Sequence, residues 1–135
     1  MELRIARPRR NWRIQFEDLS KLIDSRTKLV AVSCVSMING FQHDLKSLCG
    51  LANSRGALVF VDTVQAVGAV PVDVKASGVD FLACSSYKWL MGDMGLGSPS
   101  SMTSTSAVSR APNMASGNWL TCSITRSPTT RPARP

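Results

Sequence analysis

Apolar residues occur along this chain in short continuous runs, and segments of helical pattern separate the runs. Buried strands are predicted where β-branched and other apolar residues follow one another without interruption, at 28–35, 57–62 and 79–84. A helix is predicted over 44–55, because its apolar residues recur on one face: Leu45, Leu48, Cys49 and Ala52. Gly56 is suited to cap the end of that helix.

Two weaker patterns complete the set of predicted elements. Leu19, Leu22 and Ile23 have helical spacing and predict a short helix over 16–24. Residues 70–74 predict a short extended piece at a sheet edge, because the proline in this segment cannot donate to a ladder.

The order of these elements indicates the fold class. Strands that are apolar throughout are typical of a parallel sheet covered on both faces, and the helical segments between them supply right-handed crossovers. The sequence therefore predicts an α/β fold, part of a doubly wound and mostly parallel sheet. Ligands of such sheets bind beyond the carboxyl ends of the strands.

The composition limits the class of protein to which the chain can belong and its expected location in the cell. Its 135 residues are enough for one domain, and 44% apolar with 19% charged residues fits a globular protein. No apolar run reaches the roughly 18–20 residues of a membrane span, and the basic start lacks the apolar core of a secretory signal. The four cysteines form no CxxC pair, which argues against a zinc ribbon or a disulfide scaffold. We therefore predict a cytoplasmic protein without a membrane partner.

The net charge of +7 is unevenly distributed. Residues 98–135 hold four arginines and no acidic residue, and 20 of these 38 residues are Ser, Thr or Pro. Such a composition is typical of segments that do not pack on their own. The sequence thus predicts an ordered part at 1–97 and an irregular tail at 98–135.

Basic residues also gather near the start, where five arginines lie between positions 4 and 13. A basic protein that binds nucleic acid is one interpretation of these arginines and of the basic tail. No recognition fold accompanies them, so an exposed connecting stretch is the preferred interpretation, with no nucleic-acid partner.

Two residues with reactive potential lie where strands end. Asp62 closes the strand at 57–62, and Lys88 follows shortly after the strand at 79–84. In a parallel sheet both would lie at the same edge. A partly desolvated lysine loses its proton more easily and attacks carbonyls, and an acid beside it needs a cationic partner. The alternatives are a simple salt bridge between the two, or two solvated loop residues.

A longer series of motifs resembles the class V aminotransferase family, which includes cysteine desulfurases and isopenicillin-N-epimerase-like proteins. An apolar strand ends in Asp-Thr-Val-Gln-Ala at 62–66, Gly-Ala-Val-Pro-Val-Asp-Val follows at 68–74, and Asp-Phe-Leu at 80–82 precedes Ser-Ser-Tyr-Lys-Trp at 85–89. The resemblance runs from about residue 4 to 97 and implies the large domain of a fold type I enzyme that uses pyridoxal 5′-phosphate (PLP).

The resemblance also implies roles for individual residues. Lys88 stands at the position of the lysine that forms a Schiff base with PLP, and Asp62 at that of the acid that pairs with the pyridinium nitrogen. Gln65 matches the residue that hydrogen-bonds the 3-oxygen of the ring. Ser85 and Tyr87 match positions that contact the phosphate, where hydroxyl donors form charge-assisted bonds.

The resemblance is incomplete in two ways. Cysteine desulfurases have His and Asn where this chain has Cys34 and Met37, which weakens a desulfurase interpretation. Family members are several hundred residues long, form homodimers and act on amino acid-type substrates. The segments that supply the phosphate loop, the stacking ring and the substrate-binding arginine are expected outside this chain.

The tail departs from the family after Gly97, where the family continues with an apolar strand. If the serines that follow use TCN codons, a neighbouring reading frame encodes such a strand. We therefore hypothesise a frameshift or misassembled gene from about residue 98, which the nucleotide sequence would test.

Three functions stay open: a fragment of a PLP enzyme, an inactive remnant acting as an interaction module, and a nucleic-acid binder.

Overall fold

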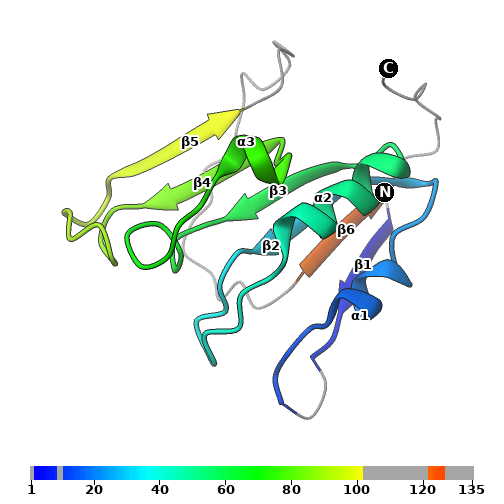
Figure 1. Ribbon diagram of the computed structural model, residues 1–135, viewed down its shortest axis with the longest axis horizontal. Coiled ribbons are helices and arrows are strands. Elements are labelled where there is room, and N and C mark those ends of the chain that lie inside the picture. The colour runs from blue at the N-terminus through cyan, green and yellow to red at the C-terminus, as the bar shows by residue number, and fades with distance from the viewer. Residues whose placement is uncertain (1, 9–10, 102–121, 127–135) are drawn as a thin grey trace.

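The computed structural model describes residues 2–8, 11–101 and 122–126 (Figure 1). Within these residues helices and strands alternate as far as β4, and two further strands follow. The helices are α1 (Phe16–Ser20), α2 (Leu45–Ser54) and α3 (Val74–Ser77). The strands are β1 (Glu2–Ala6), β2 (Thr27–Ser33), β3 (Leu58–Asp62), β4 (Phe81–Ser85), β5 (Gly97–Ser101) and β6 (Cys122–Arg126). The three predicted strands and the predicted helix at 44–55 are therefore confirmed, with ends shifted by one or two residues.

The described strands form one mixed sheet in the order β1-β6-β2-β3-β4-β5. Its centre is parallel: β2 pairs with β3, and β3 with β4. The register places Ser33 beside Asp62, and Asp62 beside Ala83. The outer strands β1, β5 and β6 run antiparallel to their neighbours. The predicted α/β class and parallel centre are confirmed.

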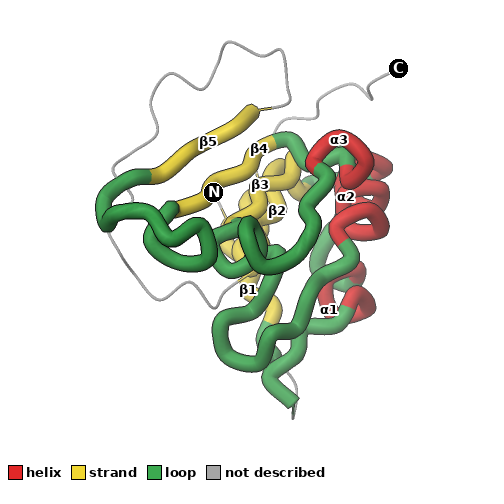
Figure 2. The backbone as a smooth tube through the Cα atoms, turned by 60° about the vertical axis from the view of Figure 1, so that its left-hand side comes forward, coloured by secondary structure: helices red, strands yellow, loops and turns green. Residues whose placement is uncertain are grey.

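The described helices cover one face of the sheet only, as Figure 2 shows with the helices on one side of the strands. The core lies between that face and α2, where Leu48, Cys49 and Ala52 are buried together with Val30 and Val59. On the opposite face, the alternate residues of β2 and β3 are only half-buried. The described residues therefore supply the helical cover of one face of the predicted sheet. An all-apolar run indicates burial but does not say which segment covers each face.

Side-chain caps explain where the helices begin. Asp44 accepts a hydrogen bond from the Ser47 N–H at 3.1 Å and starts α2 at the predicted place. Asp73 likewise accepts from the Ala76 N–H at 2.9 Å and starts α3. The segment predicted as a short extended piece at a sheet edge, 70–74, pairs with no described strand: Asp73 has an extended backbone, and the helix begins at Val74.

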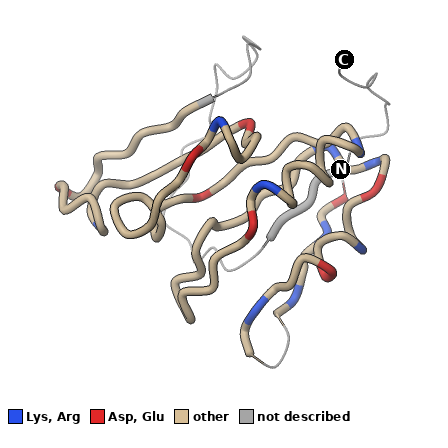
Figure 3. The backbone as a smooth tube through the Cα atoms, in the orientation of Figure 1, with Lys and Arg blue, Asp and Glu red and all other residues tan. Residues whose placement is uncertain are grey.

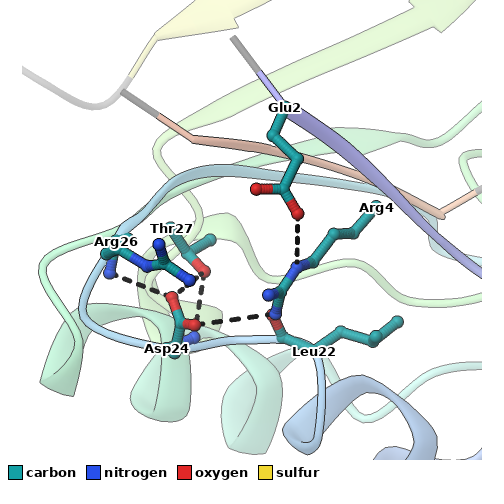
Figure 4. A network of polar contacts seen from close by, with 6 residues as sticks. All are labelled: Glu2, Arg4, Leu22, Asp24, Arg26 and Thr27. Atoms are coloured by element: carbon teal, nitrogen blue, oxygen red, sulfur yellow. Dashed lines mark hydrogen bonds and ion pairs between the residues drawn. The ribbon is translucent and has the colours of Figure 1, made fainter. Parts of the chain in front are cut away.

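β1 is joined to the turn that follows α1 by a polar network around Arg4 (Figure 4). The Arg4 guanidinium lies 3.2 Å from Glu2 and 3.6 Å from Asp24, and it donates to the Leu22 carbonyl oxygen at 3.2 Å. Asp24 also accepts from the Arg26 N–H at 3.0 Å. Arg4, one of the clustered arginines, thus has partners within the fold.

Parts of the predicted tail join the sheet. β5 pairs with β4 along its whole length as the edge strand, where a proline such as Pro99 is tolerated. β6 lies between β1 and β2. Ladder hydrogen bonds come from the backbone, so a segment rich in Ser and Thr can pair with an open strand. Residues 102–121 and 127–135 lie outside the described residues, and the boundary at 97 and the frameshift hypothesis stay predictions.

No helix among the described residues is long and apolar enough to cross a membrane. The cysteines whose side chains are described, Cys34, Cys49 and Cys84, are buried and free, as expected for small apolar residues.

Candidate functional site

The carboxyl ends of β3 and β4 place the predicted site residues at one edge of the sheet. Asp62 is the last residue of β3, and Ser85 is the last residue of β4. The two strands are parallel neighbours, with Asp62 beside Ala83. In Figure 1 both strands point toward the loop that joins β4 to β5, the loop that carries Tyr87 and Lys88.

The carboxylate of Asp62 is half-buried and held from two sides. Its Oδ1 accepts a hydrogen bond from the Val64 N–H at 2.9 Å, and its Oδ2 accepts one from the Ser33 hydroxyl at 3.4 Å. The Asp62 backbone carbonyl accepts from the Cys34 N–H at 2.8 Å. The side chain is therefore oriented before any ligand arrives. The hydroxyl of Ser33 was not foreseen, although its place at the end of a neighbouring predicted strand could have indicated it.

Gln65 lies in the turn that follows Asp62, here called the acid turn (residues 62–70). The turn is anchored to β4 by the fully buried Thr63, whose N–H and hydroxyl both donate to the Ala83 carbonyl oxygen, at 2.8 and 3.0 Å. Gln65 itself is half-buried. The anchor brings Gln65 to the same edge as the end of β4.

Tyr87 and Lys88 lie in a second loop, here called the lysine loop (residues 86–92). Both side chains are exposed, and the Lys88 ammonium lies 5.5 Å from the centre of the Tyr87 ring, a cation–π contact. The loop is closed by hydrogen bonds from the Gly92 N–H to the Ser86 carbonyl at 2.9 Å and from the Met91 N–H to the Lys88 carbonyl at 3.0 Å. The structure thus brings all five predicted residues to one edge of the sheet, two at strand ends and three in the adjoining loops.

A separate cavity of about 220 Å³ contains none of these five residues. Its lining includes Cys34, His43, Asp44 and Asp73, close to the first turns of α2 and α3. Burial lowers the pKa of His43, and burial followed by the charge of Asp62 raises the pKa of the Cys34 thiol. Both groups are therefore neutral near pH 7, and the charged side chains of the lining are those of Asp44, Lys46 and Asp73.

The two positions that depart from the desulfurase pattern lie in different surroundings. Cys34 is 1% exposed, whereas Met37 is 60% exposed in the turn after β2. Neither side chain offers the hydrogen-bonding groups of the His and Asn that it replaces.

Basic and acidic residues occur in several elements of the described chain. Figure 3 shows Lys and Arg spread along the described part of the chain, with Asp and Glu between them. Arg13 lies over the Phe41 ring at 5.5 Å, so a second clustered arginine also has a partner within the fold.

Comparisons with known proteins identify similar sequences and similar folds. A cysteine desulfurase from Klebsiella pneumoniae is 41% identical over 96 residues, which are 71% of this chain and 23% of that protein. The crystal structure of a cysteine desulfurase from Escherichia coli aligns with a TM-score of 0.64 at 29% identity and covers 70% of this chain and 23% of that one. An alanine–glyoxylate aminotransferase from Nostoc sp. aligns with a TM-score of 0.59 at 30% identity, over 67% and 24% of the two chains.

This chain therefore spans about a quarter of the length of these relatives. The family model described as aminotransferase class-V matches residues 1–126, which extends beyond the expected end of the resemblance at 97. Because that match covers nearly the whole sequence, the chain belongs to the class V aminotransferase family, whose members depend on pyridoxal phosphate.

Proposed function

We propose that this chain is the cofactor-anchoring part of a PLP-dependent enzyme that acts on amino acid-type substrates. The observation that carries the proposal is the parallel pairing of β3 and β4, which brings Asp62 and the lysine loop to one edge of the sheet. An acid and a primary amine at one edge are the two groups that a pyridine aldehyde needs from its protein.

Asp62 fits the role of partner for the ring nitrogen. A carboxylate can accept about four hydrogen bonds, and the contacts with Val64 and Ser33 use two of them. A protonated ring nitrogen can therefore bind the remaining positions without displacing an existing partner. PLP, when bound, supplies an electron sink for the substrate's reacting carbon, and the negative charge of Asp62 keeps the ring nitrogen protonated for that purpose.

Lys88 fits the role of the amine that bonds covalently to the cofactor. Its side chain is exposed, so a carbonyl ligand can reach the nitrogen without breaking packed contacts. When not bonded to the cofactor, the same amine would take and return a proton at the substrate's α-carbon. The backbone hydrogen bonds that close the lysine loop fix the point from which this side chain extends.

The remaining predicted residues would orient the cofactor. The Gln65 amide is proposed to bind the 3-oxygen of the ring, and the hydroxyls of Ser85 and Tyr87 are proposed to donate to phosphate oxygens. Hydroxyl-to-phosphate bonds are charge-assisted and about twice as strong as neutral ones.

Since Cys34 and Met37 lack the groups found in desulfurases, we propose amino acid chemistry in general, without assigning desulfuration.

The proposal is tested by titrating the 135-residue chain with PLP and following the visible absorbance of the protein-bound cofactor. Borohydride reduction then makes the carbon–nitrogen bond permanent, and mass spectrometry of peptides locates the labelled lysine. We expect label on Lys88, loss of the band in Lys88→Ala, and an unchanged band in the control Lys75→Ala, which alters an exposed lysine of α3.

A wild-type chain that shows no band, or a Lys88→Ala chain that is labelled as strongly as wild type, would overturn the proposal. The first of these results would favour an inactive remnant. A steep salt dependence of DNA binding by the same chain would favour the nucleic-acid alternative.

A further inference from the structure

We infer that Gly68 is a positioning residue, which sets the distance between the acid turn and the lysine loop by direct contact with the backbone of Trp89. The inference rests on the proposed function, because it concerns how Lys88 is aligned with Asp62. Gly68 itself touches no reacting atom.

The contact leaves no room for a side chain at position 68. A Cβ atom added to Gly68 would lie 2.8 Å from the Trp89 carbonyl oxygen, 2.9 Å from its carbonyl carbon and 3.0 Å from its Cβ. Gly68 also has a φ of +92°, in the region that L-residues with side chains rarely adopt. Two independent features therefore require glycine at position 68: its positive φ, and its close contact with Trp89. Trp89 is the next residue in the chain after Lys88.

Packing and hydrogen bonds hold the lysine loop together, so a displacement of Trp89 also displaces Lys88. A Cβ added to Gly92 would lie 2.7 Å from the Ser86 Cβ, so the two ends of the loop are packed against each other. The Ser86 hydroxyl lies within hydrogen-bond distance of the Asp93 and Leu96 carbonyl oxygens, at 2.9 and 3.1 Å. The loop therefore moves as a unit.

The acid turn is equally constrained on its side of the contact. The Ala66 and Val67 N–H groups donate to the Thr63 carbonyl oxygen at 2.8 and 3.0 Å, and the Val70 N–H donates to the Ala66 carbonyl oxygen at 2.8 Å. Thr63 is in turn bonded to β4. Neither loop can yield easily, so a side chain at position 68 must separate the two.

The size of that separation follows from the contact distance. Moving the added Cβ from 2.8 Å to an ordinary contact of 3.4 Å requires a shift of about 0.6 Å between the loops. Reacting groups need alignment within about 0.5 Å, and a misplacement of 1 Å can cost a hundredfold, so we expect PLP to bind about tenfold more weakly.

The test compares Gly68→Asn with the matched control Gly56→Asn. Asparagine tolerates the left-handed region better than other residues, so the Asn change tests mainly the steric contact. Gly56 has a φ of +73° and nothing within 4 Å of an added Cβ, and it follows α2 rather than either loop. Circular dichroism establishes that both variants keep the wild-type secondary structure.

Two quantities are measured for each folded variant: total bound PLP by equilibrium dialysis, and PLP linked to Lys88 by borohydride trapping. We expect Gly68→Asn to bind about tenfold more weakly and to show a lower ratio of linked to total PLP, with Gly56→Asn unchanged. General destabilisation would lower both quantities in proportion and leave the ratio unchanged. Wild-type affinity and ratio in Gly68→Asn would overturn the inference. Absence of PLP binding by wild type would instead overturn the proposed function.

Hydrogen exchange of the wild-type chain provides a second measurement. It tests the contact between the acid turn and the lysine loop even if Gly68→Asn does not fold or wild type does not bind PLP. Loops that are packed together open together. The Met91 and Gly92 amides should therefore show protection similar to that of the Ala66 and Val70 amides. Rapid exchange of the lysine-loop amides alone would show that the loops move independently, and would overturn the inference.

Discussion

Replacing Asp80 with alanine should destabilise the chain markedly, because this carboxylate completes the hydrogen bonding of a buried strand. Asp80 is 4% exposed, and its Oδ2 accepts a hydrogen bond from the Val59 N–H at 2.8 Å. The Asp80 N–H donates to the Val59 carbonyl oxygen at 3.2 Å. Val59 is fully buried in β3, so water cannot replace the lost acceptor in Asp80→Ala.

The magnitude follows from these contacts. A hydrogen bond to a charged group contributes about 1.5–3 kcal/mol, and an unsatisfied buried N–H costs about 1–3 kcal/mol. These two figures describe the same lost bond, so they are not added. We expect the free energy of unfolding to fall by about 2–3 kcal/mol in Asp80→Ala. Asp80→Asn keeps an acceptor oxygen and should lose less.

The assay is urea unfolding followed by circular dichroism. With a slope of about 1–3 kcal/mol per molar urea, the midpoint should fall by about 0.7–3 M. Asp93→Ala is the control, because Asp93 is exposed and its contact with the described residue Ser86 is made by its backbone carbonyl, which the substitution keeps. An Asp80→Ala midpoint no lower than that of Asp93→Ala would refute the reasoning.

Three further outcomes are expected in the same unfolding assay. His43 is the only histidine, and burial lowers its pKa below the ordinary 6.5. The unfolded chain therefore takes up this proton first as the pH falls. The unfolding free energy should then decline as the pH falls through about 6.5, the ordinary pKa of histidine, and His43→Gln should flatten the decline. Leu48→Ala, in the buried face of α2, should cost about 2–5 kcal/mol, and an unchanged midpoint would contradict the core described above. The Arg4–Asp24 pair is partly exposed, so a double-mutant cycle should give a coupling energy below about 1 kcal/mol.

Much of the site followed from sequence because its residues stand at strand ends. Asp62 and Ser85 end the predicted strands or follow them directly, and parallel strands bring such ends to one edge. The contacts of Gly68 with Trp89 and of Ser33 with Asp62 were not foreseen. They join residues more than twenty positions apart, and no local pattern marks such pairs. The sequence motif at 68–74 shows that position 68 is a glycine, but it does not show that this glycine contacts the backbone of Trp89.

The sequence alone also determined the parallel strands and the start and end of α2. Such features depend on near neighbours: continuous β-branched residues, apolar residues at helical spacing, Asp44 before the first turn and Gly56 after the last. These effects are local because a cap or an apolar stripe acts within a few residues.

The tertiary structure alone decided the order of the strands, the placement of the described helices on one face, and the entry of β5 and β6 into the sheet. It also decided that Asp73 would begin a helix where an extended piece was expected. The physical reason is that many different sequences can form the backbone hydrogen bonds between strands, and many can pack against the face of a sheet. Which segment fills an open edge or covers a face is settled by competition among all segments of the folded chain.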